Sequence, residues 1–429
     1  MRRLKLHWQI LIGIGLACIA GTLTGTDAGL FGVTYYQAYD FIGTLFLNAL
    51  KMITVPLIMA AIITGIAGIG GEAGLGRLGV KTVLYYMLTS ILAILVGLAL
   101  VNAIAPGIVD GEPAGPRLGL AENTEAALQG VEGRGAGDIA EVFLRMVPPN
   151  IIAAAAEGQM LGLIFFSLLF GYFMTRIQPD YAGSLKRIWQ GIFETMMKIT
   201  LWVMRFAPIG VFGLVAKTVS TTGFGAFVPL LSFFVTVLLA LAIHTFVILP
   251  LLLRLVGRVD PWLHFRAMSP ALLMAFSTAS SSATLPLTLE CVQENARVSN
   301  RISSFILPLG ATVNMDGAAL YECVAAMFIA QAYGMELSFG LQFTVVLLAL
   351  LTSIGVAGIP AASLVAILVI LGAIGLPIEA IGLILVTDRI LDMCRTAVNV
   401  FSDSCGAVII AKTEGETAVL SGEVAETRG

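Results

Sequence analysis

The chain has 429 residues, of which 58% are hydrophobic and 12% are charged, whereas about 25% of the residues in a soluble domain are charged. So few charges cannot keep a whole surface in water, which excludes an ordinary soluble protein and indicates that lipid surrounds much of the chain. The formal net charge of −3 excludes a strongly basic surface and, with it, a nucleic acid partner.

Six apolar segments precede residue 260. A helix needs about 20 apolar residues to cross the hydrocarbon core of a bilayer, and the candidate segments are 8–24, 38–70, 81–106, 142–176, 189–217 and 224–256. Basic residues recur after every second segment, which predicts a cytoplasmic N-terminus. The stretch 107–140 is rich in Gly, Asp and Glu, and we expect it to be a solvent loop on the extracellular side.

The last part of the sequence departs from this rhythm. Two apolar stretches are interrupted by short tips at 280–286 and 355–363, with too few apolar residues on either side for a full crossing. This pattern is typical of a re-entrant helical hairpin, whose tip must lie in protein or line a watery cavity. A full helix with polar residues in its middle is predicted after each tip, at 301–331 and 378–411. Such a repeat predicts an inverted pair of units, and paired interrupted segments indicate a transporter's binding site.

Polar residues gather on one face of the predicted helix 378–411. At about 100° per residue, one face holds Asp388, Asp392, Arg395, Asn399 and Asp403. Because charge is costly in lipid, this face must meet protein or water. The carboxylates outnumber Arg395, the single base predicted on this face. A structural stripe of ion pairs has no need of that excess, whereas a bound cation would neutralise it.

Arg395 and Asp392 suggest the chemistry of a ligand. A guanidinium offers a planar fork that matches a carboxylate, and Asp392 lies one turn away with the charge that an ammonium group needs. Together they could hold an acidic amino acid, and their pairing in the empty state is compatible with that role. Free N–H groups at the hairpin tips favour anions, whereas exposed carbonyl groups at a broken helix favour Na⁺.

Several sequence strings resemble the glutamate transporter family, also called the dicarboxylate/amino acid:cation symporters. The strings are SSSATLP (280–286), NMDGAALYE (314–322), AGIP (357–360), DRILDMCRTAVNVFSD (388–403), YYMLTS (85–90) and KMITVPL (51–57). The resemblance implies an all-α polytopic membrane protein with eight transmembrane helices, two re-entrant helical hairpins and inverted repeats. It further implies a homotrimer in which a transport part slides against a scaffold like an elevator.

The resemblance also implies a division of the chain and a location. The implied parts are 1–77, scaffold helices one and two; 78–106, the third helix, in the transport domain; 107–140, the extracellular loop; 141–222, scaffold helices four and five; 223–258, the sixth helix, in the transport domain; 259–414, the core transport domain with both hairpins and helices seven and eight; and 415–429, a cytoplasmic tail. The implied location is the cell inner (plasma) membrane, with both termini in the cytoplasm. We expect the tail after Lys412 to be disordered.

Residue by residue, the resemblance implies one substrate site and three sodium sites. Asp392 would hold the substrate's amino group and Arg395 its side-chain carboxylate. Further substrate contacts would come from Thr396, Asn399 and the backbone at Ser281 and Ile359. The first sodium site would use Asn314, Asp403 and backbone at Gly310 and Asn399; the second Tyr86, Thr89, Ser90, Asn314 and Asp316; the third backbone at Thr312, Ser353, Ile354 and Val356, with Met315 close by.

The same positions predict the coupling ions. The sodium-site side chains favour Na⁺ coupling, with about three ions implied by the resemblance, over coupling to protons alone. Glu322 matches a glutamate that carries a proton in the animal branch, which makes it the candidate for additional H⁺ coupling. Ala279 and Met393 stand where family members carry an arginine tied to K⁺, so antiport of K⁺ stays open. Ala318 replaces a threonine near the substrate, which leaves the preferred side-chain length open.

The expected function is secondary active symport that imports glutamate and/or aspartate with Na⁺, without enzymatic activity. Asp392 disfavours the alternative of a C4-dicarboxylate:cation symporter, and Arg395 disfavours a neutral amino acid exchanger. An ion channel would explain a polar stripe, but its mixed charge and the paired hairpins favour alternating access. No Ser–His, His–Glu or paired-Asp constellation in the sequence supports an intramembrane enzyme. The GxGxxG string at 74–79 follows no predicted strand, so we do not interpret it as a dinucleotide site.

Overall fold

The computed structural model describes residues 6–30, 32–69, 77–118, 120, 144, 146–157, 159–335, 338–353, 362–377 and 380–420. Most of these residues are helical, which confirms the predicted helical class. Two antiparallel ribbons interrupt the helices: β1 (Gly29–Leu30) pairs with β2 (Val33–Thr34), and β3 (Ile108–Val109) pairs with β4 (Glu112–Pro113).

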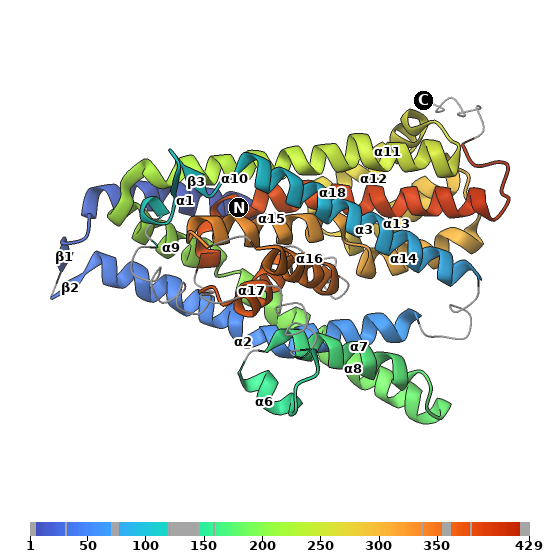
Figure 1. Ribbon diagram of the computed structural model, residues 1–429, viewed down its shortest axis with the longest axis horizontal. Helices are drawn as coiled ribbons and strands as arrows, with labels where there is room; N and C mark the ends of the chain where they lie inside the picture. The colour runs from blue at the N-terminus through green and yellow to red at the C-terminus, as the bar shows by residue number, and fades with distance from the viewer. Residues whose placement is uncertain are drawn as a thin grey trace, which may run out of the picture.

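A first group of helices comes from the N-terminal half of the chain. Its members are α1 (Leu6–Thr24), α2 (Tyr35–Ile69), α6 (Ile151–Ala156), α7 (Met160–Met174), α8 (Pro179–Met204) and α9 (Ala207–Thr222). Helices α1 and α2 pack on α9, and α2 also packs on α7 and α8 (Figure 1). A Cβ at Gly21 would lie 2.7 Å from the carbonyl oxygen of Ala216, so glycine allows α1 and α9 to approach closely.

A second group contains the C-terminal half together with α3. Its elements are α3 (Arg77–Ile104), α10 (Phe227–Ile243), η4 (His244–Ile248), α11 (Leu249–Leu252), η5 (Leu253–Gly257), α12 (Pro261–Thr278), α13 (Ser281–Glu290), η6 (Cys291–Asn295), α14 (Asn300–Val313), α15 (Asp316–Ala332), α16 (Phe339–Ser353), α17 (Ala362–Ile374) and α18 (Ile381–Thr413). Every residue of α15 is buried. Helices α3, α10, α16, α17 and α18 pack around it, so α15 is the centre of this group (Figure 1).

Helices long and apolar enough to cross a membrane occur in both groups. Within the described residues they are Tyr35–Ala67, Arg77–Ile104, Phe227–Gly257 and Asn300–Ala332. The pair Pro179–Met204 and Ala207–Thr221, bent by 54°, makes a further candidate if it is one span. These helices identify the chain as a membrane protein. The single predicted segment 142–176 is instead divided between the short α6 and α7 where the structure describes it.

The predicted first tip coincides with a break between two helices. Helix α12 ends at Thr278, Ala279 adopts a left-handed conformation with φ of 50°, and α13 begins at Ser281. The Ser280 side chain caps α13 by accepting a hydrogen bond from the Ala283 N–H at 3.2 Å. Helices α12 and α13 pack on each other, as do α16 and α17. The second tip falls mainly on 355–361, which lie outside the described residues.

The predicted continuous helix 301–331 is wrong in one respect. It is divided into α14 and α15 by Asn314 and Met315, whose backbones are not helical. Asn, Asp and Gly are weak helix formers, and the string Asn314-Met315-Asp316-Gly317 puts three of them at this point. By contrast, α18 is continuous over Ile381–Thr413, close to its predicted bounds.

The predicted solvent loop and the predicted disordered tail are both partly ordered. The start of the predicted solvent loop forms the β3–β4 ribbon, and the Gly115 N–H donates to the carbonyl oxygen of Ala332 at 2.9 Å. The tail after Lys412 was expected to be disordered, but Leu420 donates its N–H to the carbonyl oxygen of Ala296 at 3.1 Å, and Val419 is buried. That expectation is therefore wrong for 413–420, because the tail finds both an apolar site and hydrogen-bond partners.

Candidate functional site

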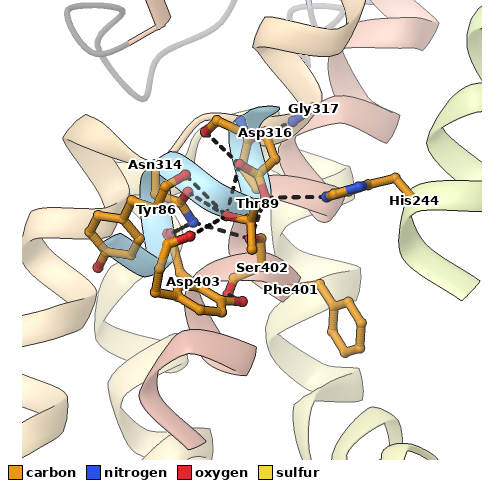
Figure 2. A network of polar contacts seen from close by, with 12 residues as sticks. Tyr86, Thr89, His244, Asn314, Asp316, Gly317, Phe401, Ser402 and Asp403 are labelled. Carbon is orange, nitrogen blue, oxygen red and sulfur yellow. Dashed lines mark hydrogen bonds and ion pairs between the residues drawn. The ribbon is translucent and has the colours of Figure 1, made fainter. Parts of the chain in front are cut away.

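The break between α14 and α15 faces α3, α18 and η4 deep in the second group of helices (Figure 2). Asn314 and Asp316 are fully buried there. A broken helix leaves backbone N–H and carbonyl groups without partners of its own, and in a membrane protein such groups are tolerated where they line a site.

Asp316 is the centre of a polar network. Its Oδ1 accepts hydrogen bonds from Ser90 Oγ at 2.7 Å and Thr89 Oγ1 at 3.3 Å. Its Oδ2 accepts from Ser402 Oγ at 2.5 Å and lies 3.2 Å from His244 Nε2. Three hydroxyl donors and the His244 ring, from three different elements, therefore hold one buried carboxylate, which fixes its position (Figure 2).

Asn314 joins this network to a second carboxylate. Its Nδ2 donates to Asp403 Oδ1 at 2.9 Å and to Ser402 Oγ at 3.1 Å, while its Oδ1 accepts from Thr89 Oγ1 at 3.3 Å. Gly310 lies against the same place, because a Cβ there would collide with the Asp403 carboxylate. The structure thus brings together most residues predicted for the first two sodium sites.

The oxygen atoms of this network suit a hard cation as ligands. Carboxylate, amide and hydroxyl oxygens are the ligands that such ions prefer, and here they come from Thr89, Ser90, Asn314, Asp316, Ser402 and Asp403. Tyr86 lies beside them and donates to the Ile306 carbonyl oxygen at 2.7 Å. The two buried carboxylates, Asp316 and Asp403, bring negative charge that a bound Na⁺ would neutralise.

Arg395 makes a second polar centre on α18. Its Nη2 lies 2.8 Å from Asp392 Oδ1 and 3.1 Å from Asp388 Oδ1, and its guanidinium lies over the Tyr321 ring at 3.8 Å. Only 1% of the Arg395 side chain is exposed. Its Nε and Nη1 have no hydrogen-bond partner in the described part of the chain. A buried guanidinium with two unsatisfied nitrogens is costly, so this arrangement suits an anionic ligand.

Asn399 connects the two polar centres. Its Oδ1 accepts the Gly317 N–H at 2.8 Å, and its Nδ2 donates to Met315 Sδ at 3.2 Å. A Cβ at Gly317 would lie 2.6 Å from the carbonyl oxygen of Arg395, so glycine lets α15 approach α18. Thr396 donates its hydroxyl to the Asp392 carbonyl oxygen at 2.8 Å.

The remaining predicted residues fall into three cases. Ser281 is buried at the start of α13, which packs on α18. Thr312 and Ser353 donate their hydroxyls to carbonyl oxygens in their own helices, Leu309 and Leu350. Ile354, Val356 and Ile359 lie outside the described residues, so the third sodium site and one substrate contact remain predictions.

Glu322 lies on α15 and contacts α16. It is fully buried, and its Oε2 accepts a hydrogen bond from Thr352 Oγ1 of α16 at 2.8 Å. Its Oε1 has no hydrogen-bond partner in the ranges that the structure describes. An ionised carboxylate is costly in such surroundings, so the geometry suits a group that takes up a proton.

Sequence reasoning missed three residues of these centres. Arg389 was not placed on the polar face, yet its Nη1 lies 3.6 Å from Asp392 Oδ2; the spacing of three residues within a helix was the available signal. Ser402 adjoins Asp403 in sequence but is absent from the predicted sites. His244 sits in an apolar run of α10 and η4, and nothing in its local sequence indicates that it reaches Asp316 on another helix.

A sequence model of the Sodium:dicarboxylate symporter family matches residues 6–413. This chain belongs to that family. The symporter is 37% identical to the Proton/glutamate-aspartate symporter of Escherichia coli (strain K12) over 415 residues, 96% of this chain and 93% of the relative. It is 36% identical to the Proton/sodium-glutamate symport protein of Geobacillus stearothermophilus over 418 residues, 97% of this chain and 96% of that protein.

An animal relative is also similar. Excitatory amino acid transporter 3 of Oryctolagus cuniculus is 34% identical to this symporter over 455 aligned residues, which cover 96% of this chain and 86% of the relative. Family membership makes the chain a membrane transporter and not an enzyme.

Proposed function

We propose that this symporter imports glutamate and/or aspartate together with Na⁺, with H⁺ as a further coupled ion through Glu322. The observation that carries this proposal is Arg395, a buried guanidinium beside Asp392 with two nitrogens that have no hydrogen-bond partner among the described residues. An acidic amino acid brings a carboxylate for the first and an ammonium group for the second. The names of the relatives, which include glutamate, aspartate, sodium and proton, support the same choice.

The proposed transport cycle couples the two centres. Na⁺ would bind among the oxygens around Asp316 and Asp403, and the substrate would bind at Arg395. Asn399 contacts both the Gly317 backbone and Met315. An ion that fixes the conformation of the break between α14 and α15 would therefore also position the face of α18 that receives the substrate. Binding of the ion and of the substrate would then favour each other, as linkage requires.

The finer architecture belongs to the same proposal. The symporter has eight transmembrane helices and two re-entrant hairpins, and its chain is divided into scaffold and transport parts at the bounds given above. It forms a homotrimer, moves its substrate by an elevator movement and binds about three Na⁺. It lies in the inner (plasma) membrane and has cytoplasmic termini. The helix break at Ala279 and Ser280 and the mutual packing of α16 and α17 support the hairpins.

Ligand binding to the purified full-length protein tests the substrate. In Na⁺, labelled aspartate and glutamate should bind, and Arg395→Ala should weaken binding at least about a hundredfold, since an ion pair to a buried charge is lost. Arg254→Ala, an exposed arginine of η5, is the matched control. Binding that is unaffected by Arg395→Ala, or binding of succinate but of neither amino acid, would contradict the proposed site.

A further inference from the structure

Asp392 lies between two guanidinium groups. Arg395 Nη2 approaches Oδ1 at 2.8 Å, and Arg389 Nη1 approaches the other oxygen, Oδ2, at 3.6 Å. The Arg389 side chain is 15% exposed and that of Asp392 is 8% exposed, so little water screens this pair. Arg389 Nε is buried and has no hydrogen-bond partner within the described residues, so no hydrogen bond through Nε draws this side chain away from Asp392.

We propose that Arg389 is a specificity-determining residue of the amino-group subsite, where it tunes how strongly Asp392 attracts an ammonium group. The inference rests on the proposed function, because it takes Asp392 as the partner of the substrate's amino group. The separation of 3.6 Å is too long for a hydrogen bond. Arg389 therefore acts on Asp392 through charge, which is effective at short range in a poorly hydrated site.

The direction of the effect follows from the charges. A substrate ammonium group must compete with Arg389 and Arg395 for Asp392, and the positive charge of Arg389 repels it. A dicarboxylate without an amino group brings only negative charge, which Arg389 attracts. Arg389 thus weakens the preference of the site for an amino acid over a dicarboxylate of the same length.

Local sequence gives Arg389 this role in this chain. It precedes Asp392 by three residues on α18, the spacing at which side chains of a helix become neighbours. Ala279 and Met393, where the family resemblance places an arginine, bring no charge. Arg389 brings a second guanidinium to Asp392 that neither of these residues can bring.

The test compares aspartate with succinate, which lacks the amino group. The dissociation constant of labelled aspartate and the inhibition constant of succinate against it are measured in saturating Na⁺ on full-length variants. Arg389→Gln should lower the dissociation constant for aspartate. It should raise the ratio of the succinate inhibition constant to the aspartate dissociation constant about five- to tenfold, because a charge is removed from a partly buried pair. Arg389→Lys keeps the charge and should stay near the wild-type ratio.

Arg254→Gln removes an exposed arginine of η5 and should leave both constants unchanged. An unchanged aspartate constant in Arg389→Gln, or an equal change for both ligands, would overturn the inference, because a merely structural role affects both alike. A wild-type protein that binds neither aspartate nor glutamate would overturn the proposed function and this inference together. Normal aspartate binding with an unchanged ratio would overturn only the inference.

Discussion

Individual residues carry most of the chemistry, and only some of them can be predicted from the sequence. Asp388, Asp392, Arg395, Asn399 and Asp403 were predicted to share a face of one helix, and all five are buried on α18. Their spacing within one helix made that prediction possible. The partners of Asp316 come from α3, η4 and α18, and such long-range contacts leave no local periodicity to detect.

Gly310 provides a test of the cation site at this scale. A Cβ at Gly310 would collide with the Asp403 carboxylate and lie 2.9 Å from the Tyr86 hydroxyl oxygen. Gly310→Ala should raise the Na⁺ concentration needed for half-maximal aspartate binding about tenfold or more, since overpacking costs about 1–3 kcal/mol. Gly372→Ala is the control, because a Cβ at Gly372 meets no atom of the described residues within 4 Å. Equal sodium dependence of both variants would contradict the site.

Glu322 provides the test of proton coupling. Gln has the same shape and can still accept the hydrogen bond from Thr352, but it cannot bind a proton. An inward proton gradient should accelerate Na⁺-driven uptake several-fold in the wild type and not in Glu322→Gln. The exposed Glu294→Gln should behave like the wild type. The same acceleration in Glu322→Gln would remove Glu322 from the coupling mechanism.

At the scale of elements, hydrophobic length predicts helices better than it predicts their interruptions. Helix α18 begins and ends close to its predicted bounds, whereas the predicted helix 301–331 is broken at Asn314. Apolar residues continue across that break, so hydropathy alone reads one helix. The order of the 413–420 tail was also missed, because its largely polar composition conceals Val419, which is buried, and Leu420, which packs against the same group of apolar residues.

The ordered tail leads to a stability prediction. Glu416 accepts hydrogen bonds from the N–H and hydroxyl of Ser299, which ties the tail to the connection between η6 and α14. Glu416→Ala should lower the melting temperature by about 2 °C, the effect of losing roughly 1 kcal/mol of hydrogen bonding. Glu112→Ala, on the exposed β3–β4 ribbon, should leave it unchanged. Equal melting temperatures of Glu416→Ala and the wild type would show that the Glu416 contact does not stabilise the fold.

The neighbouring Glu414 makes a separate contact, with Lys81, that should make stability sensitive to pH. A hydrogen bond from Lys81 holds the pKa of Glu414 below its ordinary value of 4.5. A carboxyl group with a lowered folded-state pKa stabilises the fold above its ordinary pKa, and this contribution is lost as the pH falls through the lowered value. The melting temperature of Glu414→Gln should therefore be lower than that of the wild type at pH 7, and the difference should disappear in acid.

At the scale of the whole molecule, composition identified a membrane protein and the order of several motifs identified its family. The family model covers 6–413, nearly the whole chain. Residue composition cannot give the number of subunits or ions, because those depend on surfaces and electrostatic fields created only by the assembled fold. The central claim is that one molecule joins an oxygen-lined cation site to an arginine-centred anion site.

Uptake of labelled aspartate and glutamate into proteoliposomes tests that claim most directly. The assay compares an inward Na⁺ gradient with an equal gradient of choline, each with and without an outward K⁺ gradient. We expect concentrative uptake with Na⁺ that choline does not support, and its response to K⁺ will show whether Ala279 and Met393 abolish antiport. Equal uptake in Na⁺ and choline, or concentrative uptake of succinate but of neither amino acid, would contradict the account.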